Sequence, residues 1–310
     1  MIPPTEAAEL TACDHVHVGD VEPAARPALR GYRNPIANNA RWAGFVHRPG
    51  DIFVCTPPKA GTTWMQSIVA TLLWPDGDAP GPVMVMSPWI EARFEPVDVV
   101  LARLEAQEHR RFIKTHSPPT AIPWFPTASY IVVGRDWRDA LMSFDNHLAH
   151  FRADAIDDGS NEPGLPPYNG DVHQLFEFQL ADAGYLEIIG EWWERRNEPN
   201  VLLAHFHDLK VDLEAEMRRV AVFLGIEIPE STCPALIERC TFEGMKSRSA
   251  EISDFVRYDG GADAFLYKGT NDRWRDVLTD DEVARYQSRV AGLLPPGAVT
   301  WLENGGAAIR

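Results

Sequence analysis

The sequence predicts an α/β fold with three layers (α/β/α), in which helices cover both faces of a mostly parallel central sheet. Short apolar, β-branched runs alternate along the chain with longer segments whose apolar residues recur at helical spacing. Strands that alternate with helices pair in parallel, because each helix carries the chain back across a face of the sheet. One strand-to-helix turn also carries a lysine and a glycine, as anion-binding turns do. The 310 residues suit one domain over 1–310.

The composition is that of a globular protein, with 45% hydrophobic and 24% charged residues. No apolar run approaches the roughly 20 residues needed to cross a bilayer, and no secretory signal is visible at the N-terminus. The four cysteines show no C-x-x-C spacing, so neither a metal site nor a disulfide framework is expected. These features predict a cytoplasmic protein without a membrane span.

The formal net charge of −16 argues against broad binding to nucleic acid or to anionic membranes, which needs a basic surface. It does not exclude a small anionic ligand, because such a ligand responds mainly to the nearest charged groups. A local cluster of Lys and Arg side chains must then bind that ligand.

The predicted elements follow in order along the chain. Residues 1–50 lack clear periodicity and predict an irregular N-terminal segment packed on the domain. Strands are then predicted at 51–56, 111–115, 129–134 and 201–206, and helices at 65–73, 137–150, 171–196 and 213–224. Segments 152–170 and 247–265 have the residues of long loops and predict lids over a site, although simple surface insertions explain each nearly as well.

The most informative segment is 58–64, between the first strand and the first helix. Gly61 lets the backbone approach an anion, the free N–H groups of the first helical turn point at that anion, and Lys59 adds a positive charge. The common nucleotide triphosphate loop, G-x-x-x-x-G-K-S/T, places its lysine after the second glycine, whereas Lys59 precedes the segment's only glycine. An ordinary turn that happens to carry a lysine is the alternative.

Two further segments strengthen the anion-site hypothesis. Lys114 and His116 lie at the C-terminal end of a predicted strand, where open α/β sheets bind ligands, and an imidazole there can accept a proton near neutral pH. Arg135 follows another strand and presents a planar fork suited to phosphate, while Ser143 in the next helix can donate a hydroxyl. For Arg135 alone, an Arg–Asp surface pair is the alternative.

Together these segments resemble the cytosolic-type sulfotransferases, which move a sulfuryl group from 3′-phosphoadenosine 5′-phosphosulfate (PAPS) to an acceptor hydroxyl or amine. The family's Y-P-K-S-G-T-T-W, K-T-H-x-P and V-x-R-N/D-x-K/R-D-x-x-x-S motifs correspond to 57–64, 114–118 and 133–143. Its E-W-W-E, F-x-x-M and K-G elements correspond to 191–194, 242–245 and 268–269. The matches follow the family's order across 51–289, and the chain resembles a bacterial member of the family.

The resemblance implies a role for each matched residue. His116 would take the acceptor's proton, Lys59 and Lys114 would stabilise charge on the transferred group and the leaving phosphate, and Ser143 completes the catalytic set. The implied PAPS contacts are Lys59, Ala60, Gly61, Thr62, Thr63, Trp64, Arg135, Ser143, Phe206, Thr241, Phe242, Met245, Lys268 and Gly269. The implied acceptor contacts are Trp89, His116 and His147.

Within this implied donor site, Trp64 and Phe242 would stack on the adenine, and Arg135 and Ser143 would bind the 3′-phosphate with 268–269. A sulfuryl group carries less charge than a phosphoryl group, and no carboxylate cluster accompanies the anion turn, so no metal is expected. The product would be adenosine 3′,5′-bisphosphate (PAP).

The chain departs from the family pattern at several positions. Ala60 replaces the commoner serine and Phe206 a tyrosine, and Tyr267 replaces an arginine that binds the 3′-phosphate, for which Arg273 or Arg275 would have to compensate. The family's C-terminal dimer motif is degraded, and its positions hold Arg275, Thr279, Asp280 and Ala284. The sequence therefore leaves monomer and dimer open.

Three functions are considered for this sequence. A PAPS-dependent sulfotransferase acting on a small, apolar phenol, alcohol, steroid or glycolipid is the leading hypothesis. A nucleotide kinase with a P-loop-like site is disfavoured by the position of Lys59 and by the lack of a clear metal-binding Asp after an apolar strand. A binding module for PAP without catalysis is disfavoured by the intact Lys59, Lys114, His116 and Ser143.

Overall fold

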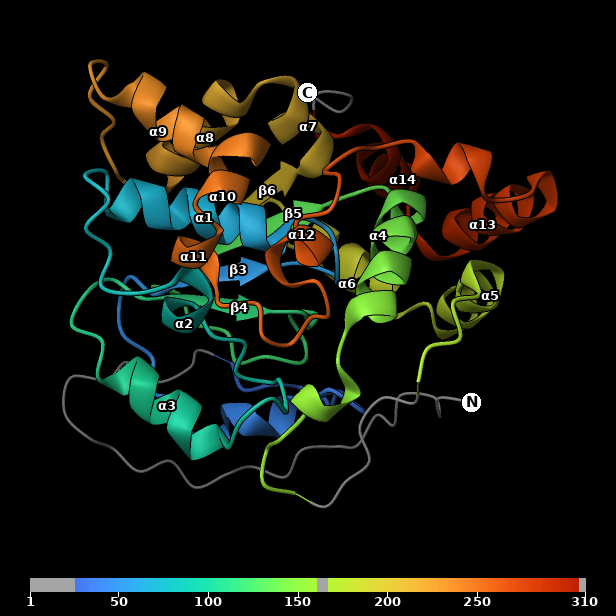
Figure 1. The fold of residues 1–310 in the computed structure, drawn as a ribbon, viewed down its shortest axis with the longest axis horizontal. Helices are drawn as coiled ribbons and strands as arrows, with labels where there is room; N and C mark the ends of the chain where they lie inside the picture. The colour runs from blue at the N-terminus through green and yellow to red at the C-terminus, as the bar shows by residue number, and fades with distance from the viewer. Residues whose placement is uncertain (1–25, 161–166, 307–310) are drawn as a thin grey trace.

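The computed structural model describes residues 26–160 and 167–306, and its centre is a four-stranded parallel sheet with the order β4-β3-β5-β6 (Figure 1). The strands are β3 (Ile52–Cys55), β4 (Phe112–Thr115), β5 (Ser129–Gly134) and β6 (Val201–His205). β3 pairs in parallel with both β4 and β5, and β5 pairs with β6. Each predicted strand is therefore confirmed, with its ends within one residue of the prediction.

The two faces of the sheet belong to separate hydrophobic cores. Ile52 and Val54 pack with α1 (Thr62–Leu73), α8 (Leu213–Leu224) and α9 (Cys233–Cys240). Phe53 and Cys55, the alternate residues of the same strand, pack with α4 (Trp137–His150), α6 (Gly184–Glu194), α13 (Asp280–Leu293) and α14 (Pro296–Asn304). Successive side chains of a strand point to opposite faces, so this division makes three layers and confirms the predicted α/β/α class.

Several shorter elements lie around the sheet (Figure 1). The helices are α2 (Val83–Met86), α3 (Val97–Glu105), α7 (Phe206–Val211) and α10 (Phe242–Ser247), with a 3₁₀ segment, η3 (Arg273–Asp276), before α13. The prediction that residues 1–50 are irregular is wrong for part of that range. It contains β1 (Arg33–Asn34), β2 (Ala37–Asn38) and η1 (Asn39–Gly44). Residues 1–25 lie outside the described part.

The single helix predicted over 171–196 is two helices, α5 (Val172–Asp182) and α6. The chain turns at Ala183, whose φ of 57° is left-handed and ends α5. Gly184 follows because a Cβ there would lie 2.8 Å from the Asp182 carboxylate and 3.4 Å from the Tyr32 hydroxyl. Both helices bury apolar residues in the same core, so the helical periodicity continues across the break and conceals it.

The two segments predicted as long loops are partly structured. Residues 247–265 contain α11 (Ser249–Ile252) and α12 (Gly261–Phe265). Residues 152–170 contain η2 (Ala153–Ala155), and residues 161–166 within them lie outside the described part. The start of the first segment contacts the middle of the second. Phe151 forms a β-bridge with Tyr258, and the Arg152 N–H donates to the Arg257 carbonyl at 3.0 Å. Their action as lids stays a prediction.

No helix within residues 26–160 and 167–306 has both the length and the apolar character that a membrane crossing requires.

Candidate active site

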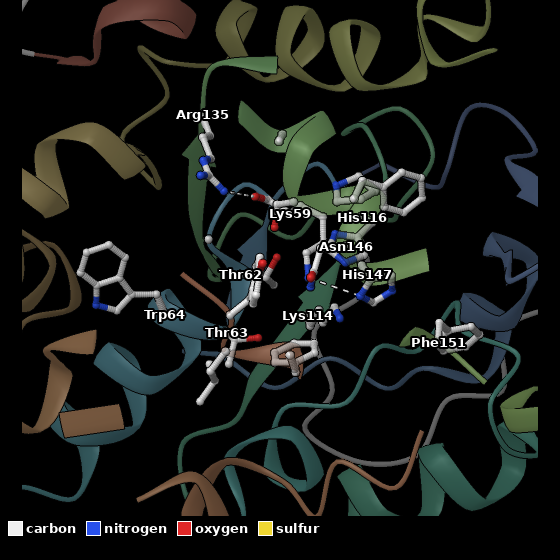
Figure 2. A pocket seen from close by; sticks show the side chains of 18 of the residues that line it. Lys59, Thr62, Thr63, Trp64, Lys114, His116, Arg135, Asn146, His147 and Phe151 are labelled. Carbon is white, nitrogen blue, oxygen red and sulfur yellow. Dashed lines mark hydrogen bonds between the residues drawn. The ribbon is translucent and has the colours of Figure 1, made fainter. Parts of the chain in front are cut away.

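A cavity of about 600 Å³ lies beside the C-terminal ends of β3 and β4 and the first turn of α1. The sequence-predicted residues that line it are Lys59, Gly61, Thr62, Thr63, Trp64, Trp89, Lys114, His116, Arg135, Ser143, His147, Phe206, Thr241, Phe242, Met245, Lys268 and Gly269. Ala60 is the exception, because it is fully buried beneath the turn. Residues from opposite ends of the chain thus converge on one space, part of which Figure 2 shows.

The anion turn has the backbone that its sequence predicts. Lys59 and Gly61 both have positive φ, of 65° and 110°, and Gly61 is the N-cap of α1. A Cβ at Gly61 would lie 3.0 Å from the Phe206 ring, so glycine is required here by both conformation and space. No side chain of the described part of the chain caps the helix, which leaves its first N–H groups available to an anion.

Lys59 is the cation of this turn, and Figure 2 shows its side chain directed toward His147 of α4. Its Nζ lies 3.3 Å from His147 Nδ1 and 4.6 Å from the centre of the Phe265 ring. Burial, together with the charges of Lys114 and Arg135, lowers the pKa of Lys59 to about 7. Because no carboxylate offsets this burial, an anionic ligand would strongly favour the protonated lysine.

His116 is held in one tautomer by the end of β3. Its Nδ1 lies 2.6 Å from the Thr56 carbonyl oxygen, which can only accept, so Nδ1 carries the hydrogen. Nε2 is then the ring nitrogen that can accept a proton. Burial and the charges of Lys114 and Lys59 hold the pKa of His116 well below its usual value, so the imidazole is neutral near pH 7.

Lys114 and Trp89 form the wall next to His116. The Lys114 Nζ lies 4.9 Å from the centre of the Trp89 ring, and that ring meets the His116 ring edge-on at 4.6 Å. Burial lowers the pKa of Lys114 to about 8, Glu91 opposes this shift, and the charge of Arg257 adds to it. The predicted acceptor contact Trp89 therefore lies directly beside the predicted base.

Arg135 connects the end of β5 to two other parts of the site. Its guanidinium donates to the Lys59 carbonyl at 3.2 Å and to the Thr270 carbonyl at 2.9 Å, and it lies 4.1 Å from the Phe206 ring. Its Nε is buried and has no hydrogen-bond partner within the described residues. Burial lowers the pKa of this arginine, whose planar fork retains a free donor for an anion.

The residues predicted for the adenine and the 3′-phosphate also line the cavity. Trp64 donates from Nε1 to the Cys240 carbonyl at 2.7 Å, which fixes its ring against Phe206. Gly269 has a φ of 60°, and a Cβ there would lie 2.8 Å from the Phe242 ring. The Thr241 hydroxyl accepts from the Gly244 N–H and begins α10.

The structure separates the two arginines that were candidates to replace the missing family arginine. Arg273 lines the cavity and lies 5.3 Å from the Tyr267 ring. Arg275 is not among the lining residues, and it donates to the Asp272 carboxylate at 2.8 Å. Only Arg273 is therefore placed beside the site.

Sequence reasoning missed Glu91, which supports the residues on either side of His116. Its fully buried carboxylate accepts hydrogen bonds from the hydroxyls of Thr115 and, at 2.9 Å, Ser117. The segment before it is also tied to β4, since the Lys114 N–H donates to the Pro88 carbonyl at 3.1 Å. The available signal was a charged residue within the apolar stretch that carries Trp89, because a buried carboxylate needs donors.

The sequence also missed most of the aromatic wall beside Lys59 and His147. Trp89, Phe94, Phe151, Tyr258 and Phe265 contact one another or His147 in a continuous series of rings. These rings come from segments far apart in the chain, and no motif marks them. They give the cavity a predominantly aromatic side next to His116.

Within the described residues, no group of three or more His, Cys, Asp or Glu side chains is arranged to hold a metal ion.

A family model described as "Sulfotransferase domain" matches residues 49–294. The chain is 33% identical to a glycolipid sulfotransferase of Mycobacterium bovis and equally to one of Mycobacterium tuberculosis, in each case over 88% of this chain and 94% of the relative. It is 27% identical to Sulfotransferase 1C2 of Oryctolagus cuniculus, over 76% and 80% of the two chains.

Solved structures show the same fold. The structure matches retinol dehydratase in a complex with retinol and PAP with a TM-score of 0.67 at 19% identity, over 96% of this chain and 98% of that one. A mouse sulfotransferase complexed with PAP gives a TM-score of 0.63 at 18% identity, over 87% and 93%. The chain therefore belongs to the sulfotransferase family, as a PAPS-dependent enzyme.

Proposed function

We propose that this sulfotransferase acts on the hydroxyl group of a small, largely apolar acceptor, with His116 as the general base. The observation that carries the proposal is the shared cavity, in which Lys59 of the anion turn and the free Nε2 of His116 line the same space. A phenol, alcohol, steroid or glycolipid fits the aromatic side of that space. The name of the mycobacterial relatives supports the glycolipid class.

The residues present fit the sulfuryl donor. The unpartnered Nε of Arg135, the uncapped start of α1 and the positive-φ glycine of the turn are all features that an anion would satisfy. When bound, PAPS supplies the sulfuryl group, which leaves its phosphate as the bond to the acceptor oxygen forms.

Each group in the donor site then has a task. The turn N–H groups and Lys59 hold the phosphosulfate, and Trp64 and Phe242 hold the adenine. The 3′-phosphate is assigned to Arg135, Ser143, Lys268 and Gly269, with Arg273 in place of the family arginine, because these residues all line the cavity. Thr241 and Met245 support Phe242 within α10 and at its cap.

His116 acts on the acceptor. Its Nδ1–H is fixed by the Thr56 carbonyl, so Nε2 accepts the proton as the acceptor oxygen attacks. Lys59 and Lys114 stabilise the charge that develops on the transferred group and on the leaving phosphate. The Trp89 ring beside Lys114 and the Phe265 ring beside Lys59 lower the local polarity, which strengthens these interactions.

The test is incubation with labelled PAPS and a panel of phenols, alcohols and steroids, without magnesium and with a chelator. Transfer of label to an acceptor is the expected result. Binding of PAP without any transfer would instead favour a non-catalytic PAP-binding module, and ATP turnover that requires magnesium would favour a kinase.

A further inference from the structure

Three cations line the cavity, and each lies over an aromatic ring. Lys59 lies over Phe265, Lys114 over Trp89, and the Arg257 guanidinium is 5.0 Å from the centre of the Phe94 ring. The two lysines face the sulfuryl group in the proposed function. Arg257 has no task in that function.

The guanidinium of Arg257 is partly exposed and has few partners among the described residues. Across residues 26–160 and 167–306 it forms no ion pair and donates no hydrogen bond, and the Phe94 ring is its one close side-chain partner. Neighbouring arginines differ: Arg93 pairs with Asp158 at 2.8 Å, and Arg41 donates to the Ile90 carbonyl at 2.7 Å. Its five N–H donors therefore lie at the edge of the cavity without an acceptor from the described residues, and a ligand has only water to displace from them.

The backbone at Arg257 is fixed, so the side chain is presented to the cavity from a defined position. The Arg257 carbonyl accepts from the Arg152 N–H at 3.0 Å, and the Asp259 N–H donates to the His150 carbonyl at 2.8 Å. The bridge between Phe151 and Tyr258 lies between these two bonds. The segment is thus anchored to the end of α4, next to His147.

The charges around Arg257 favour an anion. Lys114 lies close enough to feel the positive charge of Arg257, and Lys59 lies beyond it in the same cavity. Like charges in an apolar space repel strongly unless a counter-ion separates them. The donor supplies negative charge to the lysines, but it leaves Arg257 on the acceptor side unpaired.

We propose that the acceptor carries an oxyanion, a carboxylate or a phosphate, in addition to the hydroxyl that is sulfated, and that Arg257 binds it through a two-pronged hydrogen bond. This inference rests on the proposed function, since it names the acceptor class of the same site. The aromatic rings bind the body of the acceptor between the two groups. Transfer itself is unchanged: the acceptor oxygen bonds to sulfur, the bond from sulfur to the phosphate oxygen breaks, and His116 takes the proton.

The experiment compares matched acceptors. The probes are 3-(4-hydroxyphenyl)propanoate, its neutral methyl ester and 2-(4-hydroxyphenyl)ethyl phosphate, with the homologous alkanoates as a length series. The proteins are the wild type, Arg257→Gln, and the control Arg152→Gln, which alters an exposed arginine paired with Asp154 outside the cavity. Both kcat/KM with saturating PAPS and the Kd in the presence of PAP are measured.

The wild type is expected to prefer at least one anionic probe over the neutral ester by about 10- to 100-fold, as a charge-assisted pair predicts. Arg257→Gln should abolish this preference and leave turnover of the ester unchanged, while Arg152→Gln behaves as wild type. The carboxylate and phosphate arms show which oxyanion is favoured.

Two results would overturn the inference: equal or better use of the ester by the wild type, or a preference that survives in Arg257→Gln. If either of these results is found and the ester and other neutral phenols are still sulfated, the proposed function stands and only this inference fails. If no probe is sulfated, the proposed function fails for phenols, and the Kd values alone decide whether Arg257 binds an anion.

Discussion

The donor side and the acceptor side of the cavity are built in different ways. On the donor side, Lys59, Gly61 and Arg135 lie at the ends of β3 and β5 or at the start of α1, so the sheet fixes them. On the acceptor side, the rings come from the segment after α2, from the end of α4 and from the segment around α12. The proposed donor contacts are therefore held by the regular framework, and the proposed acceptor contacts lie on segments that can vary without disturbing it.

His116 stands between the two sides, and its replacement is expected to have the largest effect. His116→Ala should lower kcat by about 10²–10⁴-fold, the usual contribution of a general base, and leave the Kd for PAP nearly unchanged. Single-turnover rates and calorimetry with PAP measure the two quantities. His207→Ala, at an exposed histidine, is the control. Normal turnover by His116→Ala would remove this residue from the mechanism.

Arg135 tests the donor side by itself. Arg135→Gln should weaken PAP binding by about 10- to 100-fold, because a charge-assisted hydrogen bond and a link between β5 and the turn are lost together. Arg135→Lys should restore little, since an ammonium group cannot reproduce the fork over Phe206. Equilibrium binding of PAP checks both variants. An unchanged Kd in Arg135→Gln would place the 3′-phosphate elsewhere.

Glu91 tests whether the segment that carries Trp89 is coupled to the end of β4 beside His116, because its carboxylate links the two through hydrogen bonds. Glu91→Gln should lower kcat about tenfold with little change in the KM for PAPS, because it weakens the hydrogen bonds to the hydroxyls on either side of His116. Removing this charge also lowers the pKa of Lys114, so the loss of activity at high pH should begin at a lower pH. If the pH profile of Glu91→Gln is unchanged and its kcat falls only as much as its folded fraction, the role of Glu91 is purely structural.

Arg273 and Arg275 form a matched pair for the 3′-phosphate. Arg273→Gln should weaken PAP binding about 2- to 10-fold, as expected for one partly exposed hydrogen bond. Arg275→Gln should have no effect, because Arg275 lies outside the cavity and pairs with Asp272. The reverse order of effects, measured by PAP titration, would reject the assignment of Arg273.

The smallest expected signal is proton uptake when PAP binds. With a pKa of about 7, Lys59 is mostly neutral at pH 8.5 in the free protein, and a bound anion raises its pKa, so binding takes up a fraction of a proton. PAP affinity should accordingly fall as the pH rises above 7. Calorimetry in buffers with different ionisation enthalpies measures the uptake, and Lys59→Arg, which stays charged, should reduce it. Equal heats in all buffers would contradict the lowered pKa.

The outcome for individual elements shows how far the sequence could reach. The strands, the helices 137–150 and 213–224 and the anion turn were predicted because each depends on neighbours along the chain, through periodicity, caps and one glycine. The break at Ala183 was missed because both resulting helices bury their apolar residues in one core. The short helices within 247–265 were missed because four or five residues are too few to show a period.

The sequence by itself determined the class of the fold, the turn between β3 and α1 and the motifs of the sulfotransferase family, because these depend on contiguous residues. Tertiary structure alone decided that Lys59 meets His147, 88 positions away, that Glu91 supports both neighbours of His116, and that Arg257 rather than Arg93 is unpaired. Such contacts arise from the packing of distant segments around one sheet. No local pattern records them, since burial and pairing depend on what the rest of the chain brings near.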